Sequence, residues 1–296
     1  MADPERRRAG PGVSLGRPVS EAELERQEFR RNRTRRSTLI AVASTLAFAA
    51  ICSITVLNSP GWSRVQEQFF DADVAVASLP RILAGLWVNI QVLVVAAICV
   101  LALGLTIAAV RTLRGPVFFP LRALATIYTD LFRGLPLIIV LYVVGFGVPG
   151  LRLPGVPTSP VILGTVALVM TYSAYVAEVF RAGIESVHPS QRAAARSLGL
   201  TYRQTMRLVV VPQAVRRVTP PLLNDFVAMQ KDVGLISVLG AVDAVRAAQI
   251  ESSRYFDFTP YIVAGVLFVL LAIPSARIAD TLAARAVRRE QAGAVV

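Results

Sequence analysis

Long uncharged runs of apolar residues divide the chain into segments that can cross a bilayer. No charged residue occurs in residues 37–63 or 82–110, and each run exceeds the ~20 residues that span the hydrocarbon core. Four further apolar stretches of similar length follow, at residues 118–148, 161–180, 218–239 and 261–283. The pattern therefore predicts an all-α polytopic membrane protein with six transmembrane helices.

Polar segments connect these predicted spans. Residues 1–36 contain Pro, Gly and alternating charges, so we expect a disordered or loosely helical cytoplasmic tail. Loops are predicted at residues 58–81, 147–160 and 240–258, and the first of them includes an amphipathic turn at residues 69–70. Neither an internal repeat nor a second soluble domain is apparent in the sequence.

The basic residues are distributed unevenly around the spans. The chain has 31 Lys and Arg against 19 Asp and Glu, a net charge of +12. With six spans, all the arginine clusters fall on one side, and they lie at residues 26–36, 111–114, 192–207 and 285–289. Positively charged loops favour the cytoplasm, so both termini are predicted to be cytoplasmic. Nucleic-acid binding is a poorer explanation because the clusters flank apolar spans and contain few aromatic residues.

A polar segment, residues 186–217, separates the fourth and fifth spans. Ser190 is predicted to cap a first helix over residues 191–198, and Gly199 suits the left-handed position after its end. Thr201 and Gln204 have the spacing of a capping box, which begins a second helix running toward Pro212. The segment predicts a cytoplasmic helix-Gly-helix elbow, a shape suited to docking a soluble partner.

The elbow resembles the EAA loop of ABC importer permeases. The resemblance rests on residues 193–195, Gly199, Val209, Val211 and Pro212, and Ala193 stands where the motif has Glu. With Ser190 as N-cap, Ala193 would occupy N3, where a Glu would complete a capping box. The resemblance implies that the elbow (residues 186–212) docks on a cytoplasmic ATPase. The implied coupling residues are Gln191, Ala193, Ala194, Ala195, Leu198, Gly199 and Pro212. From spacing alone, an ordinary cytoplasmic hairpin is the alternative.

Four further segments are similar to the polar-amino-acid subfamily, which imports histidine, glutamate, glutamine, arginine and related compounds. They are residues 131–137, 174–184, 212–214 and 231–235. The resemblance covers about residues 83–288 and implies a five-helix type I permease domain at residues 82–288. The span at residues 37–58 is then an added N-terminal helix. A glutamate- or glutamine-type substrate is expected within this subfamily.

Charged and polar residues interrupt three of the predicted spans. Two pairs, Asp130 with Arg133 and Glu178 with Arg181, have the i,i+3 spacing of side chains that pair on one helix face. Gly134 and Pro136 favour a kink just after the first pair. The fifth span carries Asn224, Asp225, Lys231 and Asp232, of which Asn224 and Lys231 share a face. Such groups face a bundle interior or a pathway, or they brace packing near the interface.

The sequence lacks the signatures of catalytic and metal sites. Lys231, the sole lysine, is followed by Asp232 and has no preceding P-loop glycines, so no ATP-hydrolysing site is predicted. His188 is the only histidine, and Cys52 and Cys99 lie within predicted spans, so no metal site or disulfide is expected. We therefore expect a protein that is not an enzyme and has no cofactor of its own.

Energy must then come from a partner or from an ion gradient. The resemblance implies a cytoplasmic ABC ATPase that binds ATP-Mg, an extracytoplasmic solute-binding protein and a second permease subunit, identical or homologous, in the plasma membrane. The alternative is a secondary transporter or channel that uses Asp225, Lys231 or Asp232 as its ion-linked group. A non-transporting membrane scaffold is a third, weaker hypothesis.

Overall fold

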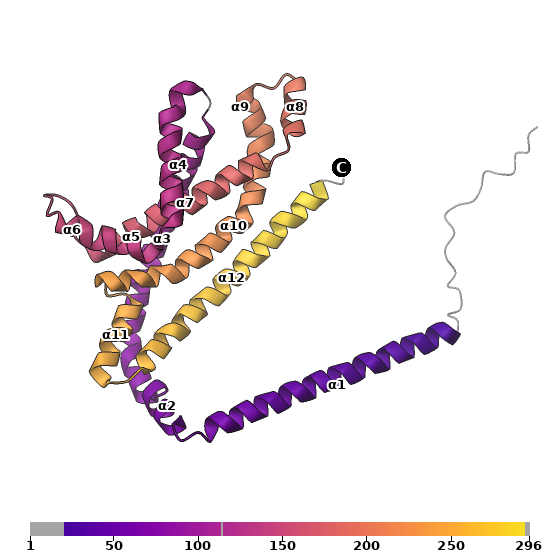
Figure 1. Cartoon of the computed structure of the whole chain (residues 1–296), viewed down its shortest axis with the longest axis vertical. Coiled ribbons are helices and arrows are strands. Elements are labelled where there is room, and N and C mark those ends of the chain that lie inside the picture. The colour runs from indigo at the N-terminus through magenta and orange to yellow at the C-terminus, as the bar shows by residue number, and fades with distance from the viewer. Residues whose placement is uncertain (1–20, 114, 294–296) are drawn as a thin grey trace, which may run out of the picture. The chain divides into compact units, whose positions relative to one another are not determined.

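A computed structural model describes residues 21–113 and 115–293, and its regular elements within these ranges are all helical (Figure 1). The chain divides into two compact units, one ending at Arg64 and the other beginning at Val65. The first unit contains α1 (Glu21–Leu57), which includes the predicted N-terminal span and part of the basic segment before it. The rest of the predicted tail, residues 1–20, lies outside the described residues.

The helices agree with the predicted number of membrane spans. Within the described ranges, four stretches are long and apolar enough to cross a bilayer, namely Arg35–Leu57, Trp62–Thr112, Pro160–Glu185 and Thr259–Ala284. Two pairs of helices meet the same test only together, and they are bent by 108° and 52° at the break between them. Counting each bent pair as one span gives six, as the hydropathy pattern predicts.

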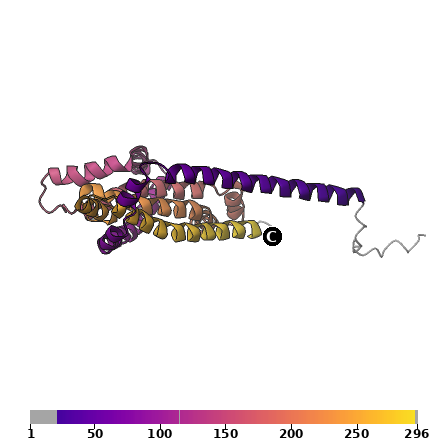
Figure 2. The same ribbon diagram turned by 90° about the horizontal axis from the view of Figure 1, so that it is seen from below.

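The centre of the second unit is built from α3 (Ala72–Thr112), α7 (Pro160–Glu185) and α10 (Val211–Asp232). α7 packs against both other helices, and α12 (Thr259–Gly293) runs alongside α10 (Figures 1 and 2). Small residues allow close crossing: a Cβ on Gly104 of α3 would lie 2.7 Å from Cγ1 of Val176. Close backbone approach of this kind is how membrane helices gain packing energy.

The predicted kink in the third span is confirmed. After a short 3₁₀ turn (Pro116–Phe118), α4 (Phe119–Gly134) ends and α5 (Leu137–Tyr142) leaves at 108°. Leu135 is extended, with φ −93° and ψ 133°, because a residue before proline disfavours the helical region. α5 continues through a π-turn (Val143–Gly147) into α6 (Val148–Gly150).

The predicted loops at residues 58–81 and 240–258 are wrong in part, because both contain helix. α2 (Trp62–Phe69) precedes α3, and α3 begins ten residues before the predicted span because Asp71 accepts hydrogen bonds from the backbone N–H groups of Asp73 and Val74. In the other loop, α11 (Ala244–Tyr255) follows a 3₁₀ segment (Val233–Leu239). Ile82 of α3 is fully buried in a cluster with alanines of α11, so tertiary packing accounts for α11.

Candidate functional site

The elbow consists of α8 (Pro189–Ser197) and α9 (Tyr202–Thr205), which lie at one end of the bundle (Figure 1). Gly199 follows α8 with φ +79°, as predicted. Its N–H donates to the carbonyl of Arg196 at 2.9 Å, and the N–H of Leu200 donates to that of Ala195 at 3.2 Å. These two bonds satisfy carbonyls at the end of α8, so the turn of the elbow is set locally.

The second half of the elbow begins at the predicted capping box. The N–H of Thr201 donates to Oε1 of Gln204 at 2.8 Å, and the N–H of Gln204 donates to Oγ1 of Thr201 at 3.3 Å. α9 then passes through a π-turn (Met206–Val210) into α10, so the chain stays helical through Pro212. Proline has no N–H to donate back to the preceding turn, and π-turns occur where regular helical bonding is interrupted.

The predicted start of α8 is wrong. His188, not Ser190, is the N-cap, and its Nδ1 accepts from the N–H of Ser190 at 3.2 Å. Pro189 takes the first helical position, which suits its fixed φ and missing N–H. Gln191 therefore lies at N3, and Ala193 lies two residues further on, beyond the reach of a capping box.

Most of the predicted coupling residues lie on the surface of the elbow. Gln191, Ala193, Ala194, Gly199 and Pro212 are exposed, and Leu198 is 82% exposed. Ala195 is an exception, because it is only 4% exposed and packs inside the hairpin. Two further apolar side chains that the sequence analysis did not select, Tyr202 and Leu208, are also exposed. The elbow therefore presents several apolar side chains among its polar and basic residues.

Glu178 near the end of α7 is the centre of an ionic cluster. Its carboxylate pairs with Arg181, as predicted, with Nε at 3.1 Å. Arg111 of α3 donates to it through Nη1 at 2.8 Å, and Nη1 of Arg133, on α4, lies 3.9 Å away. The predicted pair between Asp130 and Arg133 is therefore not formed. α4 packs on α7, which brings Arg133 to Glu178, whereas Asp130 is exposed.

The polar residues of α10 lie on two different faces. Asn224 and Lys231 are exposed on one face, which confirms that they share it. Asp225 and Asp232 are half-buried and turn toward the bundle, where Oδ2 of Asp232 accepts a 2.8 Å hydrogen bond from the hydroxyl of Tyr172. The four residues are close along the chain, but successive residues on a helix point about 100° apart, so they do not all face the same way.

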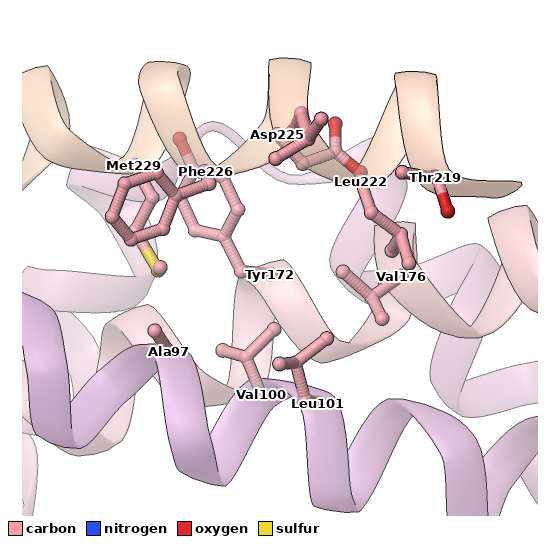
Figure 3. Close-up of a pocket in the computed structure, with 11 residues that line it drawn as sticks. Ala97, Val100, Leu101, Tyr172, Val176, Thr219, Leu222, Asp225, Phe226 and Met229 are labelled. Carbon is pink, nitrogen blue, oxygen red and sulfur yellow. The ribbon is translucent and has the colours of Figure 1, made fainter. Parts of the chain in front are cut away.

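A cavity of 280 Å³ lies between α3, α7 and α10 (Figure 3). Ala97, Val100 and Leu101 of α3 form one wall, and α10 forms the opposite wall. The lining is almost entirely apolar, with Asp225 as its carboxylate. Its Oδ2 is buried and has no hydrogen-bond partner among the described residues. An apolar pocket with one unsatisfied carboxylate oxygen suits a small molecule that carries a cationic or hydrogen-bond-donating group.

A second polar contact, missed by the sequence analysis, lies in the half of α3 that packs on α11. Asn89 donates through Nδ2 to Oδ2 of Asp243 at 2.9 Å and accepts from the N–H of Ala244 at 3.0 Å. Asn89 and Asp243 are 1% and 0% exposed. The sequence indicates this contact only by the presence of a polar residue, Asn89, within the uncharged run of residues 82–110. This contact ties α3 to the start of α11.

Comparison with known proteins identifies the family. The model of the family described as "Binding-protein-dependent transport system inner membrane component" matches residues 102–288. The arginine transport system permease protein ArtQ of Bacillus subtilis is 32% identical over 204 residues, which cover 69% of this chain and 91% of that protein. The probable glutamine ABC transporter permease protein GlnM of the same organism is 40% identical over 169 residues, covering 56% and 76% of the two chains.

A solved structure agrees with this assignment. A chain in the "Crystal structure of an amino acid ABC transporter with histidines" superposes with a TM-score of 0.67 and 31% sequence identity, covering 73% of this chain and 98% of that chain. The family match covers well over half of the sequence, and the relatives match over most of their length. The chain therefore belongs to the family of binding-protein-dependent transport system inner membrane components.

Proposed function

We propose that this chain is the permease subunit of an ATP-driven importer of a polar amino acid, with glutamine or glutamate as the substrate class. The observation that carries the proposal is its similarity, over most of their length, to permeases named for arginine and glutamine transport. The cavity beside α10 supports it, because 280 Å³ is a volume suited to a small solute.

Asp225 is the residue proposed to bind the amino acid's ammonium group. Asp225 lines the cavity and its Oδ2 has no hydrogen-bond partner among the described residues, whereas the neighbouring Asp232 is already bonded to Tyr172. A buried carboxylate oxygen without a donor is costly, and an ammonium group would satisfy it. Asn224 and Lys231 do not line this cavity, and their exposed face is available to a second permease subunit.

The partners follow from the shape of the elbow and the absence of a P-loop. We propose that a separate cytoplasmic ABC ATPase, which binds ATP-Mg, docks on the exposed residues of α8 and α9. An extracytoplasmic binding protein delivers the amino acid at the other side of the membrane. The arginine clusters support an orientation with both termini and the elbow in the cytoplasm of a cell whose plasma membrane holds the complex.

The test is amino-acid uptake by the complete complex, comprising permease subunits, ATPase and binding protein, in liposomes. We expect ATP-dependent uptake of glutamine or glutamate and stimulation of ATP hydrolysis by the same amino acid. Asp225→Asn should raise the concentration for half-maximal uptake by roughly tenfold or more, the range expected when a charged hydrogen bond is weakened. Asp130→Asn is the matched control, because Asp130 is exposed on α4 and lies outside the cavity.

The same liposomes separate this proposal from a gradient-driven transporter. A protonophore added at constant ATP should leave uptake unchanged if ATP is the energy source. Uptake that stops when the gradient collapses, and that needs no ATPase, would favour the alternative in which Asp225, Lys231 or Asp232 is an ion-linked group. The absence of flux under every condition would favour a scaffold.

A further inference from the structure

Two arginines from other helices reach the carbonyl groups at the end of α7. Arg192 of α8 donates to the carbonyl of Ile184, and Arg217 of α10 donates to that of Ser186. The last carbonyls of a helix lack intrahelical partners and carry the negative end of the helix dipole. α7 has no basic residue in its last turn, which instead contains Glu185. Arg181 of α7 pairs with Glu185, so the guanidinium groups at the last carbonyls come from α8 and α10.

The same region is tightly packed. Val187, in the turn between α7 and α8, is 1% exposed. Next to it, α7 crosses α10 so closely that a Cβ on Gly183 would lie 2.1 Å from Cγ1 of Val218. The two guanidinium groups therefore join three helices at a point where little relative movement is allowed. Arg192 thus adds a contact between α8 and the end of α7 to the covalent connection through the turn at residues 186–189.

We propose that Arg192 and Arg217 are positioning residues that couple the elbow to the membrane helices. A displacement of α8 then moves the end of α7 with it, because bending at the turn would break the contact between Arg192 and Ile184. The start of α10 follows because Arg217 holds it to the carbonyl of Ser186. From α7 the movement continues through Glu178, whose carboxylate pairs with Arg111 of α3 and lies near Arg133 of α4. The proposal rests on the proposed function, in which an ATPase acts on the elbow.

The test compares uptake with ATP hydrolysis in the complete complex in liposomes. For the Arg192→Ala/Arg217→Ala variant, we expect the ATPase to remain bound and active, while the amount of amino acid imported per ATP falls about fivefold or more, the lower range of coupling between distant sites. Replacing both residues by Lys keeps a charged donor at each position and should restore much of the ratio. Arg216→Ala is the matched control, because Arg216 is exposed on the same helix, next to Arg217.

The possible outcomes are distinct. An unchanged import-to-hydrolysis ratio in the double variant overturns the proposal, and so does a fall of uptake and hydrolysis in equal proportion, which is what simple destabilisation gives. If the double variant does not assemble, the Arg192→Ala and Arg217→Ala single variants are measured, and unchanged ratios in both overturn the proposal. A wild-type complex without ATP-dependent uptake would instead contradict the proposed function, since the ratio would then have no meaning.

Discussion

Removing the amide of Asn89 should destabilise the second unit strongly. Asn89→Ala removes the partner of three buried groups, namely Oδ2 of Asp243, the N–H of Ala244 and the carbonyl of Val233. None of these groups gains access to water, because Asn89 and Asp243 are 1% and 0% exposed and Ala244 and Val233 are also buried. The substitution therefore tests whether the contact between α3 and α11 holds this part of the fold together.

The expected magnitude follows from the two shorter of the lost bonds, those to Asp243 and Ala244. A hydrogen bond to a charged group contributes about 1.5–3 kcal/mol, and a buried donor left unpaired costs about 1–3 kcal/mol. Together they predict a loss of roughly 3–5 kcal/mol, at the upper end of what single substitutions do. For a protein of this size that corresponds to a fall in Tm of roughly 6–20 °C.

Thermal unfolding of the purified protein in detergent measures the effect. Thr106→Ala is the matched control, because Thr106 is exposed on the same helix and its hydroxyl bonds only to Ala102 of its own helix. The control should change Tm by less than about 2 °C. Asp243→Ala completes a double-mutant cycle, which should show a coupling energy of about 0.5–3 kcal/mol. An Asn89→Ala variant with the Tm of the control, or a cycle without coupling, would refute the reasoning.

Three further predictions concern the elbow and its junction with the bundle. Gly183→Val should lower the free energy of unfolding by about 1–3 kcal/mol, because its side chain would clash with Val218. Adding Val218→Ala to that variant should recover part of the lost Tm, and no recovery would show that the clash is not with Val218. Gly199→Ala forces a Cβ into φ +79° and should destabilise the elbow by roughly 1 kcal/mol, measured as faster amide exchange in α8, and an unchanged rate would contradict it. Gln191→Glu places a carboxylate at N3 and should stabilise α8 by about 0.3–1 kcal/mol, whereas Ala193→Glu should be nearly neutral in the same assay. A larger stabilisation by Ala193→Glu would indicate that Ser190, and not His188, is the N-cap.

Features set by neighbouring residues could be predicted from the sequence. The spans follow from local hydropathy, and the turn at Gly199 and the capping box at Thr201 depend on residues a few positions apart. The kink before Pro136 has the same local origin. The predicted start of α8 is wrong because the ring of His188 caps the helix, and Pro189 suits the first helical position.

Features set by tertiary packing could not be predicted in this way. α11 is polar along much of its length, and it is helical where its alanines meet α3. The pairing of Arg133 depended on the position of α7, because i,i+3 spacing to Asp130 contributes only about 0.2–0.5 kcal/mol. A partner on another helix outweighs that preference. The cavity at Asp225 likewise requires three helices that are far apart in sequence.

The polarity of α10 bears on how the chain enters the membrane during synthesis. Residues 202–239 meet the criteria for a span only together with α11, and Asp225 and Asp232 carry charges that are expensive at bilayer depth. The helices that contact these two carboxylates are synthesised before α10. Tyr172 on α7 bonds to Asp232, and α3 and α7 line the cavity beside Asp225. α10 therefore reaches the bilayer after its polar partners are in place, and the order of the helices along the chain is also a workable order of insertion.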